Sequence, residues 1–419
     1  MKILLAGRGS QGDIYPYLIL ASELEKRGHR VTVSLPRLFE QEAKEAGVTY
    51  TLQAQDDIAG MVEGTPDARH LIEWTKRVIK SQFEEFIPLM AGHEILVAAN
   101  TEFGAPSVAE YCGKPLVRTA FGPFIPGRLI PPPVLPFPEP NPLIRPALLW
   151  AALNTGLNLM VKKPLNQCRR ALGMGPVRDQ AEHAPAMADN FLLYSRYLGE
   201  TDPAWAYRWG IGGYCFNDTF PYDARLHRDF LDFVKKDRRP TVFFTLGSCN
   251  TVQRDSFAQK LFDVCCEQGY KLVVGCGWWK VGLHLHNKEN LFLLNSAIPH
   301  VLIFPNVDAV IHHGGSGTTH SAGRAGKPQM ALPLIIDQFY WAYRIYKLGI
   351  GPRGINIGKI SKEDLEKKVV DLVTNPSYRE KAKALGALIR SENGVQAACE
   401  RIEGALSSGI REEGAAVNE

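Results

Sequence analysis

The chain opens MKILLAGRGSQGD, residues 1–13, and this stretch decides the fold. An apolar run, Ile3–Ala6, leads directly into the glycine spacing G-x-G-x-x-G of residues 7–12. The following segment, Tyr17–Arg27, has apolar residues at helical spacing and ends at Gly28. A buried strand, a glycine turn and a helix in that order predict the first unit of a Rossmann-like parallel sheet.

The same alternation of short apolar strands and helices recurs along the chain. Strands are predicted at residues 30–35, 95–99, 116–119 and 191–194, and then at 241–245, 270–275, 291–294, 309–312 and 329–332. Such strands, separated by helices, indicate parallel sheets covered on both faces. The sequence therefore predicts an α/β fold with two Rossmann-like domains that face each other across a cleft. The proline-rich segment 122–146 is predicted to have no regular structure and to serve as a functional loop or lid.

Length and composition exclude several classes of protein. The chain has 419 residues, long enough for two domains, and 45% of them are hydrophobic. No stretch approaches the roughly 18–20 apolar residues of a membrane span, and the N-terminal strand lacks the features of a signal peptide, so we predict a cytoplasmic protein. The net charge of +4 is too small to indicate nucleic-acid binding and allows at most peripheral contact with a membrane. The eight cysteines have no C-x-x-C spacing, which predicts buried free thiols.

The glycine spacing of residues 7–12 also occurs in dinucleotide-binding proteins, which usually carry an acid about 20 residues further on, at the end of the second strand. Here that strand ends Ser34–Arg37, without an acid. Asp13 stands instead where the helix N-terminus would receive a pyrophosphate. An NADP-dependent oxidoreductase stays an alternative. Asp13 itself is either a helix cap or a general base that faces a substrate admitted by the glycines.

A second glycine-rich turn, AVIHHGGSGTTH at residues 309–320, carries the strongest chemical signal. A strand again runs into glycines and a helix, and the turn holds His313, Ser316 and Thr318. Backbone amides, the helix dipole, the two hydroxyls and a hydrogen bond or charge from His313 predict a site for a phosphate. A metal site on His312, His313 and His320 is disfavoured, because neighbouring residues of a strand point to opposite faces.

These two turns, FFTLGS at residues 243–248 and the run 298–352 resemble the GT-B glycosyltransferases of family 1. The resemblance is closest to the branch of bacterial antibiotic glycosyltransferases, rhamnosyltransferases and sterol glucosyltransferases, and it extends over nearly the whole chain. It implies the GT-B fold, with an acceptor domain at residues 1–215, a linker at 216–239 and a nucleotide-sugar domain at 240–393. It also implies that residues 394–419 cross back onto the first domain as a helix.

The resemblance further implies roles for individual residues. The diphosphate would contact the turn after the strand 309–312 and the opposite loop, through His313, Gly315, Ser316, Gly317, Thr318 and Ser248. The nucleobase would lie against Ala297 and Ile298, and the sugar hydroxyls would bind Asp337 and Gln338. Asp13 would be the general base of an inverting transfer, at the position where plant members have a catalytic histidine steadied by a carboxylate. Since no acid stands at residues 99–100, we expect Asp13 to act directly, and no metal or other cofactor is expected.

The acceptor is predicted from the aromatic residues of the first half, which form either a core or the wall of an apolar pocket. Candidate acceptor-binding residues are Gly12, Trp74, Phe121 and Phe124, and further aromatics occur at Phe83 and Phe86. We predict a hydrophobic acceptor: a sterol, terpenoid, polyketide or lipid. The predicted activity is that of a hexosyltransferase using UDP-glucose, with dTDP-sugars as the alternative donors. A catalytically silent glycosyltransferase-like partner protein stays a further alternative, and a monomer or weak homodimer is expected.

Overall fold

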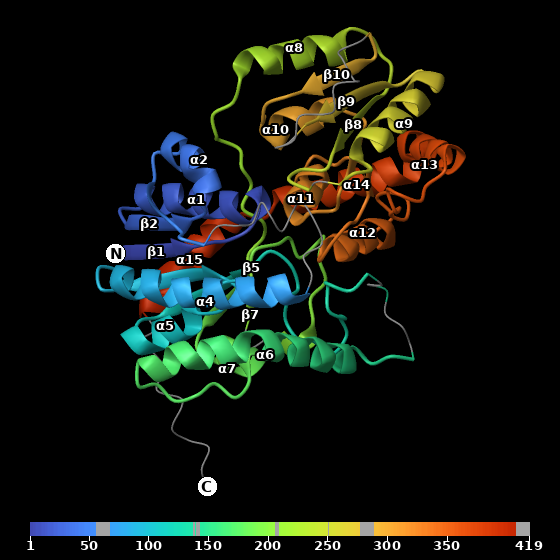
Figure 1. Ribbon diagram of the computed structural model, residues 1–419. Coiled ribbons are helices and arrows are strands. Elements are labelled where there is room, and N and C mark those ends of the chain that lie inside the picture. The colour runs from blue at the N-terminus through green and yellow to red at the C-terminus, as the bar shows by residue number, and fades with distance from the viewer. Residues whose placement is uncertain are drawn as a thin grey trace.

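The computed structural model describes residues 1–55, 68–136, 139, 143–205, 209–249, 251–276 and 289–407. Two lobes, each built around one sheet, lie one above the other in Figure 1. Strand pairing is parallel throughout both sheets, and helices pack against them. The predicted α/β class with two parallel sheets is therefore confirmed.

The first sheet, in the described residues, has seven strands in the order β3-β2-β1-β4-β5-β6-β7. They are β1 (Lys2–Ala6), β2 (Arg30–Leu35), β3 (Thr49–Leu52), β4 (Ile95–Ala99), β5 (Leu116–Ala120), β6 (Asp189–Leu192) and β7 (Trp209–Ile211). The sequence did not predict β3 and β7. Both are short edge strands that are only partly buried, so neither has the continuous apolar run of a central strand.

The second sheet has five strands in the order β10-β9-β8-β11-β12. They are β8 (Thr241–Thr245), β9 (Lys271–Gly275), β10 (Leu291–Leu294), β11 (Ala309–His312) and β12 (Gln329–Ala331). Each was predicted to within a residue or two, because all five, the edge strands β10 and β12 included, are short runs that are almost entirely buried.

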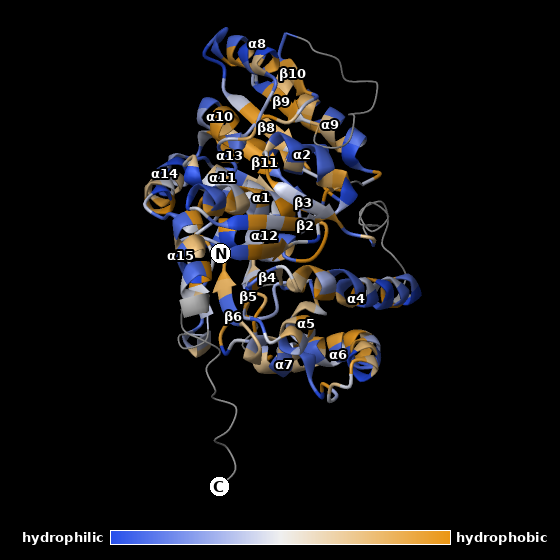
Figure 2. Ribbon diagram, turned by 90° about the vertical axis from the view of Figure 1, so that its left-hand side faces the viewer, coloured by the Kyte–Doolittle hydropathy of each residue, from blue (hydrophilic) through white to orange (hydrophobic). Residues whose placement is uncertain are grey.

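Helices cover both faces of the first sheet. Ile3 and Leu5 of β1 pack toward α1 (Gln11–Lys26) and α15 (Gly394–Ser407), while Leu4 and Ala6 pack toward the opposite side. That side is covered by α4 (Ala68–Met90), α5 (Ala105–Cys112) and α6 (Pro146–Ala171). The other helices are α2 (Glu40–Glu45), α7 (Gln180–Ala186), α8 (Ala224–Lys235), α9 (Arg254–Glu267), α10 (His300–Ile303), α11 (Ser316–Arg324), α12 (Gln338–Lys347), α13 (Lys362–Thr374) and α14 (Pro376–Arg390). Figure 2 shows the apolar strands enclosed between helices whose outer sides are hydrophilic.

The helix α1 begins at Gln11, six residues before the predicted start, and so places Asp13 in its first turn. Pro16 lacks an N–H and leaves the carbonyl of Gly12 without its helical donor. The hydroxyl of Tyr214 donates to that carbonyl at 3.5 Å. The apolar spacing of the sequence indicated only the part of the helix from Tyr17, whereas the interpretation of Asp13 as a helix cap already placed the helix N-terminus near that residue.

The C-terminal helix α15 crosses back to the first lobe, as the resemblance implied, and appears in red among the blue elements of Figure 1. Its residues Ala398, Cys399 and Ile402 are at most 2% exposed and belong to the core of the first sheet. Glu403 accepts hydrogen bonds from Arg27 and His29 near the end of α1. The terminal residues 408–419, which the sequence assigned to the same returning segment, lie outside the described residues, and the boundaries of the domains stay predictions.

A buried apolar cluster also joins the two lobes. Tyr194 and Leu198, which follow β6, pack against Tyr340 and Trp341 of α12. The Nε–H of Arg344 donates to the carbonyl of Leu198 at 2.9 Å. The lobes are thus connected by packed side chains as well as by the two crossings of the chain.

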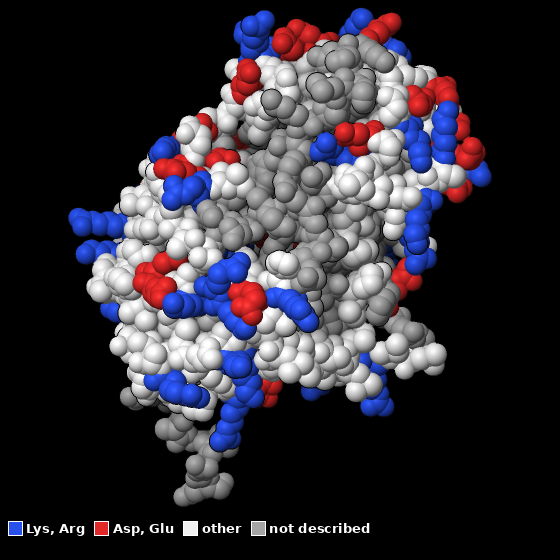
Figure 3. Space-filling model, in the orientation of Figure 1, with Lys and Arg blue, Asp and Glu red and all other residues white. Residues whose placement is uncertain are grey.

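The described helices and the surface charges bear on whether the protein could contact a membrane. Among the described residues, no helix is long and apolar enough to span a bilayer. On the face shown in Figure 3, Lys and Arg side chains lie interspersed with Asp and Glu side chains.

The described part of the proline-rich segment between β5 and α6 contains neither helix nor strand, as predicted. Its residues 137–138 and 140–142 are outside the described set.

Candidate active site

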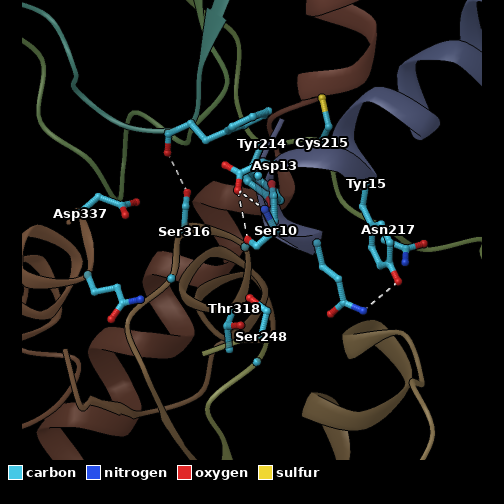
Figure 4. Close-up of a pocket in the computed structure, with 18 of the residues that line it drawn as sticks. Ser10, Asp13, Tyr15, Tyr214, Cys215, Asn217, Ser248, Ser316, Thr318 and Asp337 are labelled. Atoms are coloured by element: carbon cyan, nitrogen blue, oxygen red, sulfur yellow. Dashed lines mark hydrogen bonds between the residues drawn. The ribbon is translucent and has the colours of Figure 1, made fainter. Parts of the chain in front are cut away.

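A cleft of about 1830 Å³ lies between the two lobes, at the carboxyl ends of both sheets. This is where open parallel sheets bind ligands. All fifteen residues that the sequence nominated for catalysis, donor binding or acceptor binding line it, and Figure 4 shows several of them. The structure therefore brings these residues together, whereas their individual roles stay predictions.

Asp13 completes the capping box of α1, whose N-cap residue is Ser10, and it also lines the cleft. Its Oδ2 accepts hydrogen bonds from the backbone N–H of Ser10, at 2.7 Å, and from the Ser10 hydroxyl, at 3.1 Å (Figure 4). Gly9 has a φ of +143°, and a Cβ at that position would collide with the Asp13 carboxylate. Burial raises the pKa of Asp13 above its ordinary value of 3.8, although the bonds from Ser10 act in the opposite direction. A helix cap and a general base, the two interpretations of Asp13 that the sequence left open, are therefore compatible with each other.

An acid does lie near the end of β4, slightly beyond the position that the sequence analysis considered. Glu102 is buried, and its Oε1 lies 3.4 Å from Nε of Arg8 in the first glycine turn. Gln82 donates a further hydrogen bond to the same carboxylate. Because its partners are Arg8 and Gln82, Glu102 holds the guanidinium and is no relay to Asp13. Within the described chain, Ser10 is the hydrogen-bonding partner of the Asp13 carboxylate.

The N-termini of α1 and α11 face each other at two glycines. A Cβ added to Gly317 would lie 2.8 Å from the hydroxyl of Tyr214 and 3.8 Å from Cα of Gly12. The ring of Tyr214 stacks on His320 of α11 with centroids 4.7 Å apart. Tyr214 therefore connects both helix N-termini, and the sequence offered no motif that could have identified it.

His313 is held between two glycines of the donor half. A Cβ on Gly247, whose φ is +58°, would lie 2.8 Å from the imidazole, and a Cβ on Gly315 would overlap it. Burial and the neighbouring His312 and His300 lower the pKa of His313 to about 3. The ring is therefore neutral at pH 7, and a neutral imidazole can donate a hydrogen bond, which is one of the two options in the sequence analysis. No group in the described chain bonds its Nδ1, which is buried.

The other two histidines of the metal alternative already use their ring nitrogens within the protein. His312 accepts from the N–H of Gly314 and contacts Gln329 at 2.9 Å. His320 accepts from the N–H of Ser195 and contacts the carbonyl of Ser316 at 2.7 Å. Burial lowers the pKa of each to about 4. Searched over the described residues, the chain has no group of three or more His, Cys, Asp or Glu side chains positioned to hold a metal ion.

Hydroxyl groups surround the glycine-rich turn between β11 and α11. The Ser316 hydroxyl donates to the carbonyl of Phe121 at 2.8 Å and so links the lobes. Thr318 and Ser248 lie next to each other in Figure 4, on the side of the cleft opposite Asp13. Ala297 is exposed to the cleft beside the buried Ile298, whose side chain belongs to the second lobe's core.

Asp337 and Gln338 begin helix α12. Asp337 accepts a hydrogen bond from Nε1 of Trp341 at 2.9 Å, and burial together with the charge of Asp13 raises its pKa to about 7. The side-chain oxygen of Gln338 accepts from the backbone N–H of Leu334 at 2.8 Å, which fixes the preceding turn. That turn contains Ile336 at a φ of +48°, a conformation that β-branched residues rarely adopt.

The acceptor half of the cleft is largely apolar. Trp74 of α4 and Phe121 and Phe124 beyond β5 line it, whereas Phe83 and Phe86 are buried between α4 and the sheet. The α6 residues Trp150, Leu153, Leu157 and Met160 form a further wall. Arg118 of β5 also lines this part and was not nominated from the sequence.

Two family models match the chain. The Glycosyltransferase family 28 N-terminal domain matches residues 3–129. The Erythromycin biosynthesis protein CIII-like, C-terminal domain matches residues 289–402. The two matches cover both glycine turns of the cleft.

Characterised relatives cover most of the chain. Glycosyltransferase GtfE of Amycolatopsis orientalis is 30% identical over 84% of this chain and 85% of its own length. Sterol 3-beta-glucosyltransferase UGT80B1 of Arabidopsis thaliana is 26% identical over 95% of this chain and 67% of its own length. The solved structure of glycosyltransferase VinC in complex with DTDP has a TM-score of 0.70 at 15% identity and covers 98% of this chain and all of its own. The protein therefore belongs to the GT-B glycosyltransferases, in the branch that contains sterol and antibiotic glycosyltransferases.

Proposed function

We propose that the protein is an inverting hexosyltransferase that moves glucose from UDP-glucose to a hydroxyl of an apolar small molecule, with Asp13 as the general base. The observation that carries this proposal is the opposition of Asp13 in α1 to the N-terminus of α11 across one cleft. A carboxylate on one side and an anion site on the other are what a single displacement at a sugar carbon requires.

In the proposed step, the acceptor oxygen forms a bond to the anomeric carbon as the bond from that carbon to the diphosphate breaks. The acceptor proton passes to Asp13, and the nucleoside diphosphate leaves with the bonding electrons. The amides of α11, its dipole and the neutral ring of His313 stabilise the charge that develops on the diphosphate. No metal is needed, because protein donors meet that charge.

The proposed donor is UDP-glucose, and the alternative donor is a dTDP-sugar. The relatives named as glucosyltransferases support glucose as the transferred sugar. VinC, a structural neighbour, was solved with DTDP, which supports dTDP-sugars as the alternative. Ala297 and Ile298 are the proposed nucleobase contacts in either case.

The apolar wall of α4 and α6 supports a hydrophobic acceptor. A sterol fits one of the relatives, a sterol 3-beta-glucosyltransferase, and another relative is a vancomycin aglycone glucosyltransferase, which acts on a natural-product aglycone. Family membership excludes the oxidoreductase alternative. If the protein were a catalytically silent partner, it would have Asp13 and the α11 turn but would transfer no sugar.

The proposal is tested by incubating the protein with UDP-glucose or dTDP-glucose and a mixture of sterols, terpenoids and polyketide aglycones. Mass spectrometry should detect an acceptor whose mass has increased by one hexose, with or without EDTA. If no donor gives a product while UDP and TDP both bind, the protein is a silent binder. If EDTA abolishes transfer, the metal-free mechanism is wrong.

Replacing His313 with alanine should weaken UDP binding and slow transfer together, since the imidazole would contact the diphosphate before and during the reaction. The loss of one hydrogen bond to a charged group is worth about 1.5–3 kcal/mol, roughly ten- to a hundredfold in affinity. Titration calorimetry measures it, with His300→Ala as a control that removes another neutral histidine, which is half-buried at the cleft. An unchanged UDP affinity in His313→Ala would remove this residue from the donor site.

A pH dependence follows from the two carboxylates of the cleft. Asp13 must be ionised to accept a proton, so kcat/KM should rise with pH through a limb above the ordinary aspartate value of 3.8. Asp13 and Asp337 repel each other when both are charged. This repulsion raises the pKa of Asp337 and not that of Asp13, so Asp13 ionises first, beside a neutral Asp337. Asp337→Asn should therefore leave the limb in place. A limb that moves in Asp337→Asn would show that the observed titration belongs to Asp337.

A further inference from the structure

Arg118 lies in the acceptor half of the cleft and comes from the middle of β5. Its neighbours in the strand divide between the two faces of the sheet. Val117 packs toward α1, and Leu116 packs toward α4 and α6. Since side chains alternate along a strand, Arg118 extends to the side of α4 and α6, where the apolar wall of the pocket stands.

The guanidinium of Arg118 has no acidic partner in the part of the chain that the structure describes. Its contact there is with the ring of Trp209, whose centroid lies 6.0 Å away. Arg118 is half-buried. Three arginines that are buried are each paired with a carboxylate: Arg8 with Glu102, Arg169 with Glu110 and Arg344 with Glu200. Arg118 differs from all three.

Burial without a carboxylate is unfavourable for a cation. Consistently, desolvation lowers the pKa of Arg118 to about 10, with no opposing charge to restore it. The residue still carries its positive charge at neutral pH. A cation without a carboxylate partner, beside an apolar wall, is the complement of an anion on an apolar ligand.

The position of Arg118 defines where that anion would lie. In the register of the sheet, Arg118 is aligned with Ala98 of β4, and Ala98 is aligned with Ala6 of β1. Ala6 immediately precedes the glycine turn that leads to Asp13. Two strand spacings of about 4.8 Å separate the alignment positions, so the backbone of Arg118 lies about 10 Å across the sheet from the strand that leads to Asp13, and the anion would lie at the end of the Arg118 side chain.

We propose that Arg118 binds a carboxylate or phosphate at the far end of an apolar acceptor and so determines acceptor specificity. The inference rests on the proposed function, because it takes the bound molecule to be the acceptor of the sugar. The binding preference that it predicts does not depend on turnover. The acceptor would be a hydroxylated, amphipathic acid, long enough for its hydroxyl to reach Asp13 while its anion contacts the guanidinium. Trp150, Leu153 and Leu157 of α6 would cover the apolar body between them.

The test compares lithocholic acid, which has a hydroxyl at one end and a carboxylate at the other, with its methyl ester. A second pair, 12-hydroxystearic acid and its methyl ester, has a flexible body. Binding is followed by the fluorescence of the cleft tryptophans, without any donor, or by calorimetry. The wild-type protein should prefer at least one acid over its ester by about ten- to a hundredfold, as expected for a charge-assisted hydrogen bond.

Arg118→Met should remove this preference, and Arg118→Lys should keep part of it. The control is Arg170→Met, which removes an exposed arginine of α6 that does not line the cleft. UDP and TDP affinity should be the same in all variants, since the proposed donor residues lie in the second lobe. Equal binding of acid and ester by the wild type, no binding of either, or an acid preference that survives in Arg118→Met would each overturn the inference. An acid preference that depends on Arg118, in a protein that transfers no sugar, would contradict the proposed function alone.

Discussion

Asp13→Asn should lower the rate of sugar transfer by about 10²–10⁴-fold, the usual cost of losing a general base. Asparagine has nearly the same shape, and its side-chain oxygen still accepts the hydrogen bond from the N–H of Ser10. The helix cap and the fold should therefore survive, and only the proton acceptor is lost. UDP affinity should stay within a few-fold of the wild-type value, because the proposed donor contacts come from the other lobe.

The matched control for this variant is Ser10→Ala. It removes the hydroxyl bond to the Asp13 carboxylate at 3.1 Å and leaves the base in place. Single-turnover rates of both variants, with circular dichroism as a check on folding, separate the two roles of Asp13. A folded Asp13→Asn protein with the wild-type rate would reduce this residue to a helix cap.

Truncation after Ser391 should unfold the first lobe and abolish transfer. It removes α15, whose Ala398, Cys399 and Ile402 are buried in the core of the first sheet. Truncating one such isoleucine to alanine typically costs about 2–5 kcal/mol, against a total stability of about 5–15 kcal/mol for a typical domain. The loss of the whole helix should exceed what the lobe can tolerate.

The same truncation also reaches the cleft directly. Gly394 lies so close to the chain crossing that an added Cβ would be 2.6 Å from the carbonyl of Tyr214. Without α15, Tyr214 loses this support beside Gly12 and α11. Thermal unfolding and transfer assays check the expectation, with truncation after Ser408, which keeps α15, as the tolerated control. Full activity and an unchanged Tm after truncation at Ser391 would show that the returning helix is dispensable.

The sequence predicted the parts of this structure whose signals are local. The central strands β1, β4, β8 and β11 are largely apolar runs. The glycine turns after β1 and β11 mark where the chain leaves each sheet at the cleft. Because the carboxyl ends of parallel strands meet at one edge, the residues of those turns had to come together.

The features that the sequence did not predict depend on contacts between distant segments. Tyr214 matters because Pro16 frees the Gly12 carbonyl, and neither residue indicates the other. Glu102 escaped notice because its partner, Arg8, comes from another strand's turn. Whether His313 is charged depends on its burial among other histidines, and the importance of Arg118 lies in the lack of a described acidic partner.

The anomeric configuration of the product tests the central claim most directly. With UDP-α-glucose as donor and any acceptor that gains a hexose, the NMR coupling constant of the anomeric proton distinguishes the two configurations. A single displacement, with Asp13 drawing the proton from one side as the diphosphate departs on the other, predicts a β-linked glucoside. An α-linked product would contradict the account.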